Sequence, residues 1–259
     1  DANTSGARNI AIGTNAYGAS DTENDNLAIG HSAMGTDTAG GNHNLAIGNY
    51  TLDALTSGDS NIAIGNSAMG AATTAGSNTA IGYQALDANT TGNINVAIGY
   101  DALGSLTTAD ANVAVGREAL AAVTTGTRNT GLGTSAGMTA TTVNDNTSLG
   151  YAALKDNAAA SNTAVGSYAL TENTTGADNT AVGHTSLYTN TTGAGNTAIG
   201  RESLYYNTTG ARNVAVGRYA LNANTTASDN VAVGFTAGGQ ITTGTRNIAI
   251  GNYAYDASD

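Results

Sequence analysis

The amino-acid sequence predicts an all-β fold, a parallel β-solenoid of about fifteen coils. The motif N-x-A-[I/V]-G, with minor variations, recurs fifteen times, and twelve of the fourteen intervals between copies share the 17-residue spacing that separates Asn78 from Asn95. A unit of this length is too short for a helix-turn-helix repeat but suits one coil of a solenoid. The 35 glycines and the frequent Ile, Val and Thr favour strands over helices. The unbroken period predicts a single array over residues 1–259.

We number each copy from its opening asparagine, which occupies position 0. Asparagine tolerates left-handed backbone conformations and bonds to nearby backbone groups, so these residues are expected at a bend of each coil. In-register stacking at about 4.8 Å per coil would align them as an amide ladder along a rod of about 70 Å. The expected ladder consists of Asn9, Asn26, Asn44, Asn61, Asn78, Asn95, Asn112, Asn129, Asn146, Asn162, Asn179, Asn196, Asn213, Asn230 and Asn247.

Positions 1 to 3 predict a short strand with two apolar faces. Position 1 is Ile, Leu, Val or Thr and position 3 is Ile, Val or Leu, so a bulky pair shares one face. Position 2, on the other face, is Ala except at Gly131 and Ser148. A strand that is apolar on both faces is usually buried on both. One face can fill the coil, and the repeat leaves too few residues for a second layer, so we expect the other face to meet another chain.

Two further segments complete each coil. Positions 7 and 8 often read Ala-Leu, as in Ala85–Leu86, and give the coil its largest regular apolar side chain. A Thr-Thr-Gly segment follows, as in Thr174–Gly176, and its glycine is expected to supply the positive φ of a turn. The interval before Asn44 is one residue longer than the others and the interval before Asn162 is one residue shorter. Both differences should be absorbed in turns.

The composition limits the classes of partner. The net charge is −11 and Lys155 is the only lysine, which disfavours binding to nucleic acids or acidic membranes. No apolar run is long enough to insert into a membrane, and no signal-peptide pattern is present. The acidic surface, rich in Thr, Asn and Gly, suits a soluble extracellular protein. Because neither end carries a distinct cap, we expect a segment of a longer fibre or a processed filament subunit.

No group of side chains predicts catalysis or a cofactor. His31, His43 and His184 are far apart in the sequence and there is no cysteine, which argues against a transition-metal site. No Gly-x-Ser-x-Gly elbow frames a nucleophile and no carboxylate pair stands out, so we expect a non-enzyme. Calcium could bind acidic residues before an opening asparagine, but the GGxGxD pattern of calcium-binding β-rolls is absent, and solvated turn residues are the simpler interpretation. These residues are Asp25, Asp145, Asp178 and Asp229.

The most variable column, position 5, is the candidate binding surface. Tyr and Arg are favoured in recognition surfaces and stacked rings suit sugar faces, although such residues could also merely cover the coil or bridge chains. Tyr188, Tyr205 and Tyr206 form a second cluster with the same two interpretations. The candidate column comprises Tyr83, Tyr100, Arg117, Tyr151, His184, Arg201, Arg218 and Phe235. N-glycosylation sequons begin at Asn89, Asn173, Asn190, Asn207 and Asn224, but they recur because the repeat recurs.

The units NVAIGYDAL, NTAIGYQAL and NVAVGREAL resemble the head repeats of trimeric autotransporter adhesins of the YadA type, which read roughly SVAIGxxSxA with a shorter period. The NTTG segment and the 17-residue spacing are still more similar to the repeat arrays of phage tail-fibre proteins. The resemblance covers nearly the whole chain. It implies a left-handed β-roll, three chains side by side, and a role in adhesion or host recognition. The stalk and membrane anchor of an autotransporter are absent from this sequence, which favours a tail fibre or another extracellular filament.

Two functional hypotheses follow. The first is a non-enzymatic structural and adhesive fibre segment, a homotrimeric spacer that attaches to a host-cell or environmental surface, for instance through glycans. The second is a monomeric ligand-binding solenoid, such as an ice-binding protein. It is motivated by the threonine pairs, as in Thr90–Thr91, of which one member per coil would point outward.

Overall fold

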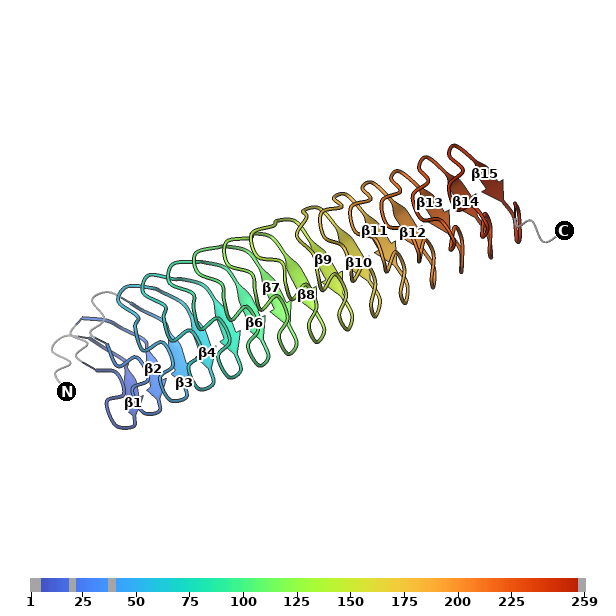
Figure 1. Cartoon of the computed structure of the whole chain (residues 1–259). Coiled ribbons are helices and arrows are strands. Elements are labelled where there is room, and N and C mark those ends of the chain that lie inside the picture. Colours follow the sequence, from blue (N-terminus) through green and yellow to red (C-terminus); the bar gives the residue numbers. More distant parts are fainter. Residues whose placement is uncertain (1–5, 19–21, 37–40, 256–259) are drawn as a thin grey trace. The chain divides into compact units, whose positions relative to one another are not determined.

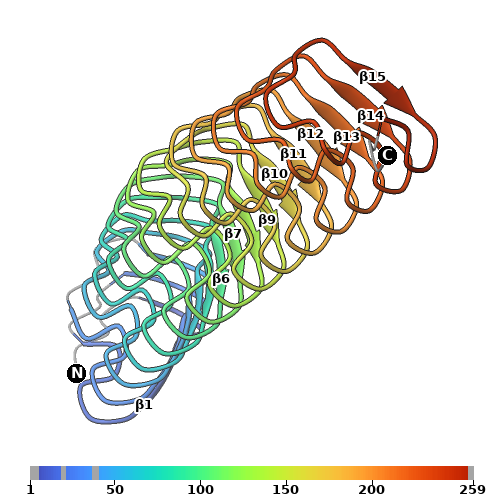
Figure 2. The same cartoon turned by 45° about the vertical axis from the view of Figure 1, so that its right-hand side comes forward.

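The computed structural model describes residues 6–18, 22–36 and 41–255 and confirms the predicted parallel β-solenoid (Figure 1). Within these residues each coil contributes one strand of three residues, and no helix is present. The chain forms two compact units, Asp1–Asn129 and Thr130–Asp259. In both Figure 1 and Figure 2, the strands of each unit lie side by side on the same side of their coils.

The strands occupy positions 1 to 3 of every copy. Those of the first unit are β1 (Ile10–Ile12), β2 (Leu27–Ile29), β3 (Leu45–Ile47), β4 (Ile62–Ile64), β5 (Thr79–Ile81), β6 (Val96–Ile98) and β7 (Val113–Val115). Those of the second unit are β8 (Thr130–Leu132), β9 (Thr147–Leu149), β10 (Thr163–Val165), β11 (Thr180–Val182), β12 (Thr197–Ile199), β13 (Val214–Val216), β14 (Val231–Val233) and β15 (Ile248–Ile250). Within each unit, neighbouring strands pair in parallel and in register, so each sequence column stacks on itself.

The small face of the strand lies inside the coil. Position-2 alanines such as Ala97 and position-8 leucines such as Leu103 have no exposed surface. In the second unit these two columns belong to one core cluster, which includes Ala198 and Leu204. The bulky face points outward instead, and Ile98 is 36% exposed. The Ile/Val face is therefore the one that stays open in a single chain.

A series of left-handed residues turns the chain sharply after each strand. Position 4 is glycine in every copy, with φ between 123° and 140°. Positions 6 and 8 also have positive φ, as in Asp101 (53°) and Leu103 (51°). A Cβ on Gly99 would lie 2.4 Å from the carbonyl oxygen of Gly116 in the next coil. Since both φ and this close approach exclude a side chain, position 4 requires glycine.

Two expectations about the turns are wrong. At the second bend, the left-handed residue is not the opening asparagine but the residue before it, such as Asp25 (φ 61°). The asparagine is held instead by its ladder contacts. The glycine of the Thr-Thr-Gly segment, such as Gly92, is also outside the left-handed region. That column needs a small residue because a Cβ on Gly92 would lie 2.3 Å from the carbonyl oxygen of Ala109.

The opening asparagines form a buried hydrogen-bonded ladder. The backbone N–H of Asn95 donates to Oδ1 of Asn78 at 2.9 Å, and the N–H of Asn112 donates to Oδ1 of Asn95 at 2.9 Å. Nδ2 of Asn95 donates to the carbonyl oxygen of Ala109 at 2.8 Å, near the end of the same coil. The Asn95 side chain thus satisfies a backbone group of the next coil and another of its own coil, and the ladder asparagines from Asn26 to Asn230 are buried away from water.

The turns take up the irregular coil lengths. β9 and β10 stay in register across the shorter coil, and β2 and β3 across the longer coil. In the short coil, the missing residue falls between Asn157 and Ser161, where other coils carry Thr-Thr-Gly. The extra residue of the long coil falls between Thr36 and Gly41, among positions outside the described residues.

Candidate functional site

The position-5 column lies on the outer surface, directly after the glycine turn. Seven of its candidate side chains are exposed, and Phe235 is half-buried. In the first unit, Tyr83 and Tyr100 stack with ring centroids 5.5 Å apart, and the guanidinium of Arg117 lies 5.7 Å from the centroid of Tyr100. Positions 9 and 10 of these coils include small residues such as Ala88 and Gly104. They therefore contribute no aromatic side chain beside this stack.

Tyrosines from four columns form a continuous series in the second unit. The ring centroids of Tyr151 and Tyr168 are 5.1 Å apart, and those of Tyr168 and Tyr188 are 6.4 Å apart. Tyr188 and Tyr205 stack at 5.4 Å, and Tyr205 meets Tyr206 edge-on at 4.7 Å. The series crosses from positions 5 and 6 to positions 9 and 10, on either side of the buried positions 7 and 8. We call the surface formed by these five rings and the two hollows along it the tyrosine groove.

Both hollows combine aromatic rings with hydrogen-bonding groups. One of about 240 Å³ is lined by Ser135, Tyr151, Ala152, Lys155, Asp156, Tyr168, Thr171, Glu172 and Tyr188. The other, of about 300 Å³, is lined by His184, Thr185, Glu202, Tyr205, Tyr206 and Asn222. The stacked rings of Tyr188 and Tyr205 connect them, because each ring lines one hollow.

Two phenols of the groove have a pKa above the ordinary value. Burial raises the pKa of Tyr205 above its ordinary value. The electrostatic effects of Tyr188, Tyr206 and two glutamates raise it further. A hydrogen bond with Tyr151 is the main cause that raises the pKa of Tyr168. Both hydroxyl groups therefore stay protonated at neutral pH and can donate hydrogen bonds as well as accept them.

Sequence reasoning found only part of this site. It singled out Tyr151 and His184 in one column and the Tyr188, Tyr205 and Tyr206 cluster in another, and the structure brings them to one surface. It missed Tyr168 at position 6. Alternation along a strand would turn position 6 inward, but the left-handed conformation there turns positions 5 and 6 both outward. The recurrence of tyrosine at position 6 was the available signal.

The last three members of the column lie outside the groove's lining. Arg201 pairs with Glu202 at 2.9 Å, and Arg218 lies 4.6 Å from the centroid of Tyr219. Phe235 meets Tyr219 edge-on at 6.1 Å. These contacts connect neighbouring side chains on the surface.

No family model, curated protein or solved structure matches this chain. The resemblance of its repeat to adhesin heads and tail fibres therefore stays a prediction, as do the handedness and the number of chains. Within the described residues, no helix is long and apolar enough to cross a membrane.

The three histidines do not come together. His31 meets Tyr50 edge-on at 5.2 Å, Nε2 of His43 lies 3.5 Å from a carboxylate oxygen of Asp25, and His184 lines the tyrosine groove. Across the described part of the chain, no group of three or more His, Cys, Asp or Glu side chains could hold a metal ion.

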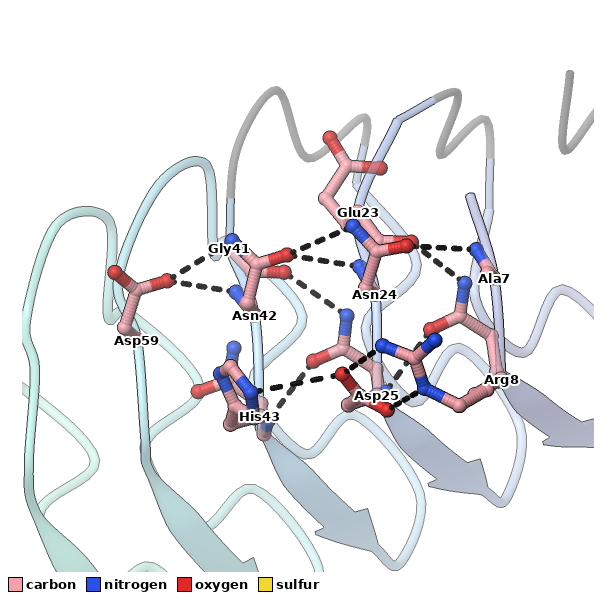
Figure 3. Close-up of polar contacts among 12 residues, drawn as sticks. Ala7, Arg8, Glu23, Asn24, Asp25, Gly41, Asn42, His43 and Asp59 are labelled. Carbon is pink, nitrogen blue, oxygen red and sulfur yellow. Dashed lines mark hydrogen bonds and ion pairs between the residues drawn. The ribbon is translucent and has the colours of Figure 1, made fainter. Parts of the chain in front are cut away.

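Two of the four acidic turn residues, for which calcium binding was the less simple interpretation, are engaged by arginines. Asp25 accepts a hydrogen bond from Nη2 of Arg8 at 2.7 Å, and Figure 3 shows its carboxylate between Arg8 and His43. Asp229 accepts one from Nε of Arg212 at 2.7 Å. In each pair, the arginine hydrogen bond holds the pKa of the carboxyl group below its usual value. These carboxylates connect neighbouring coils.

The sequon asparagines are buried and engaged, which removes them as glycan acceptors in the folded chain. Nδ2 of Asn190 donates to Oδ1 of Asn173 at 2.8 Å and to the carbonyl oxygen of Gly193 at 2.9 Å. Asn207 repeats the pattern one coil later, with Nδ2 at 2.8 Å from Oδ1 of Asn190. The four sequon asparagines of the second unit, together with Asn157, form a second amide ladder that ends at Asn224.

The two threonines of a pair differ in their contacts. The first threonine donates its hydroxyl to a carbonyl oxygen of the next coil, as from Thr90 to Thr107 at 3.1 Å. The second threonine, such as Thr91, is exposed. In the coil of Asn78, the pair thus presents one exposed threonine, as the sequence predicts.

A cluster of carboxylates in the first unit makes a pH-dependent contribution to stability. Burial raises the pKa of Asp101 above its usual value, and the charges of Glu118 and Asp87 raise it further. Because the folded-state pKa exceeds the unfolded one, folding favours the protonated form. The resulting stabilisation is complete below the unfolded pKa of about 4 and is lost as pH rises through the folded value.

Replacing Asp101 with asparagine should therefore stabilise the first unit at pH 7. The amide removes the like-charge contacts and suits the left-handed backbone of this residue (φ 53°). We expect a gain of about 0.5 kcal/mol, small because solvent screens the charges. Thermal unfolding at pH 7 and pH 4 checks this, and the gain should shrink at pH 4. Asp178→Asn, on an exposed turn, is the control; an equal gain in both variants would contradict the assignment.

Proposed function

We propose that this chain is a non-enzymatic structural and adhesive fibre segment, located outside the cell or on a virion, in which three copies lie side by side. The observation that carries the proposal is the outward Ile/Val face of the strands, which carries Ile, Val or Leu at position 3 of every copy and Ile, Leu, Val or Thr at position 1. Solvent-exposed residues on this face include Ile62, Ile98, Ile199 and Val233. Monomeric proteins rarely expose a continuous apolar surface of such extent.

The regular spacing of this face makes a second copy its natural partner. The seven strands of the first unit, about 4.8 Å apart, carry two ranks of bulky side chains over about 30 Å. A partner with the same spacing can match these ranks coil by coil, whereas an unrelated surface would lose register within a few coils. The number of three copies comes from the resemblance of the repeat to trimeric fibres.

The mass in solution tests the assembly. A trimer has three times the mass of the 25.5 kDa chain, and light scattering after gel filtration distinguishes it from smaller assemblies. A mass of one chain would contradict the proposal, because the Ile/Val face would then be stable while exposed.

A charge placed on the face should break the assembly. An aspartate in place of Ile98 would be buried without a partner, at about 3 kcal/mol or more for each chain. The matched control is Ile94→Asp, because Ile94 is 66% exposed and occupies the turn column that carries aspartate in other coils. We expect light scattering to show dissociation of Ile98→Asp alone, with circular dichroism confirming that both variants fold. A trimeric Ile98→Asp variant would show that this face is not the interface.

A further inference from the structure

The tyrosine groove has the features of a site for a neutral, polyhydroxylated chain. Its tyrosine rings present apolar surface to solvent. Tyr206 is 53% exposed and Tyr151 is 50% exposed. Between the rings stand groups that can bind hydroxyls. Among the described residues, no ion pair occupies the side chains of Lys155, Asp156 or Glu172, all of which line the smaller hollow.

The charge of the groove argues against an anionic ligand. Asp156, Glu172 and Glu202 line it, and Lys155 is the only lysine or arginine among its lining residues. A phosphorylated, sulfated or otherwise acidic chain would meet net repulsion. Neutral sugars meet none, since their hydroxyls can donate to the carboxylates while their C–H faces pack on the tyrosine rings.

The geometry of the coils matches the repeat of such a ligand. Successive coils advance by about 4.8 Å, close to the advance of one pyranose unit in an extended glycan. The two hollows belong to overlapping sets of coils, one around Tyr151 to Tyr188 and the other around His184 to Asn222. A ligand lying along the stacked rings of Tyr188 and Tyr205 would therefore place successive sugar units against successive coils.

We propose that the tyrosine groove binds an extended neutral glycan of several pyranose units. The inference deepens the adhesive part of the proposed function by naming the class of ligand. The groove begins at position 5, beyond the glycine turn at position 4 that separates it from the Ile/Val face at positions 1 and 3.

The test uses an array of neutral and acidic glycans, followed by calorimetry with the strongest neutral oligosaccharide. Tyr188→Ala and Tyr205→Ala should each weaken binding about tenfold, because each removes the aromatic side chain that lines one hollow. Tyr188→Phe should keep most of the affinity. Tyr83→Ala with Tyr100→Ala, which removes the stack of the first unit, is the matched control and should bind normally.

The outcomes are separable from those of the assembly test. Binding of neutral glycans that is lost in the groove variants and kept in the control supports the proposal. Binding of acidic glycans alone, of proline-rich peptides alone, or of no array member would overturn it, as would an equal loss in the control. The groove variants should keep the mass of the unmodified protein, so a failure of glycan binding does not depend on whether the chains associate.

Discussion

Replacing Gly200 with alanine should destabilise the second unit by about 3–5 kcal/mol, because a left-handed strain and a backbone collision act together. Gly200 has a φ of 130°, and an added Cβ would lie 2.6 Å from both the carbonyl carbon and the carbonyl oxygen of Gly217. The two backbones cannot separate easily, since the N–H of Gly217 donates to the carbonyl oxygen of Ile199 at 2.7 Å. Denaturant unfolding of the second unit, followed by hydrogen exchange at β12 and β13, measures the effect.

Gly195, five residues earlier, provides the control. Its φ of 68° is also left-handed, but the nearest atom to an added Cβ is Cγ of Arg212 at 3.6 Å. Gly195→Ala should therefore cost only the backbone preference, about 1 kcal/mol. Equal losses in the two variants would contradict the combined effect of backbone strain and collision at Gly200.

The second large effect is expected from Asn95→Ala in the asparagine ladder. The substitution leaves the buried N–H of Asn112 without its acceptor and the carbonyl oxygen of Ala109 without the donor at 2.8 Å. Each unsatisfied buried group costs about 1–3 kcal/mol, so we expect a total loss of about 3–5 kcal/mol. Denaturant unfolding gives the total, and faster hydrogen exchange at the amide of Asn112 identifies the bond that was lost.

Asn93→Ala is the matched control for the ladder. Oδ1 of Asn93 accepts from the N–H of Gly76 at 2.8 Å, which resembles the ladder bond, but Asn93 is only half-buried. Water can replace the lost acceptor there, so the loss should stay below about 1 kcal/mol. If Asn93→Ala were as damaging as Asn95→Ala, the importance of the ladder would not come from its burial.

The period and the side-chain columns made the fold predictable. Identical spacing in most of the fifteen copies fixes which residues stack, and the alternation of Ala97 with Val96 and Ile98 defines two strand faces. The columns did not say which face lies inside, because both are apolar. Packing decides this: the alanine leaves room for the position-8 leucine, such as Leu103, within a narrow coil.

The turns and most of the groove were harder to predict. Propensity rules assign left-handed conformations to glycine and asparagine, whereas here leucine, tyrosine and glutamate adopt them because stacked neighbours hold the backbone in place. Leu204 (φ 50°) is a clear case. The contact of Tyr168 with Tyr188 depends on these conformations, so the columns that join at the groove could not be identified from alternation alone.

The asparagine ladder also bears on how such a gene can change. Each coil offers Oδ1 to the next coil and a backbone N–H to the previous one, so the two ends of any coil match the two ends of any other. Recombination between repeats that removes or adds one whole period would join equivalent positions of two coils. Every hydrogen bond of the ladder could then form again. The length of the array can therefore change between generations by whole coils. Insertions or deletions of a single residue persist only where a turn accommodates them, as in the coils before Asn44 and Asn162.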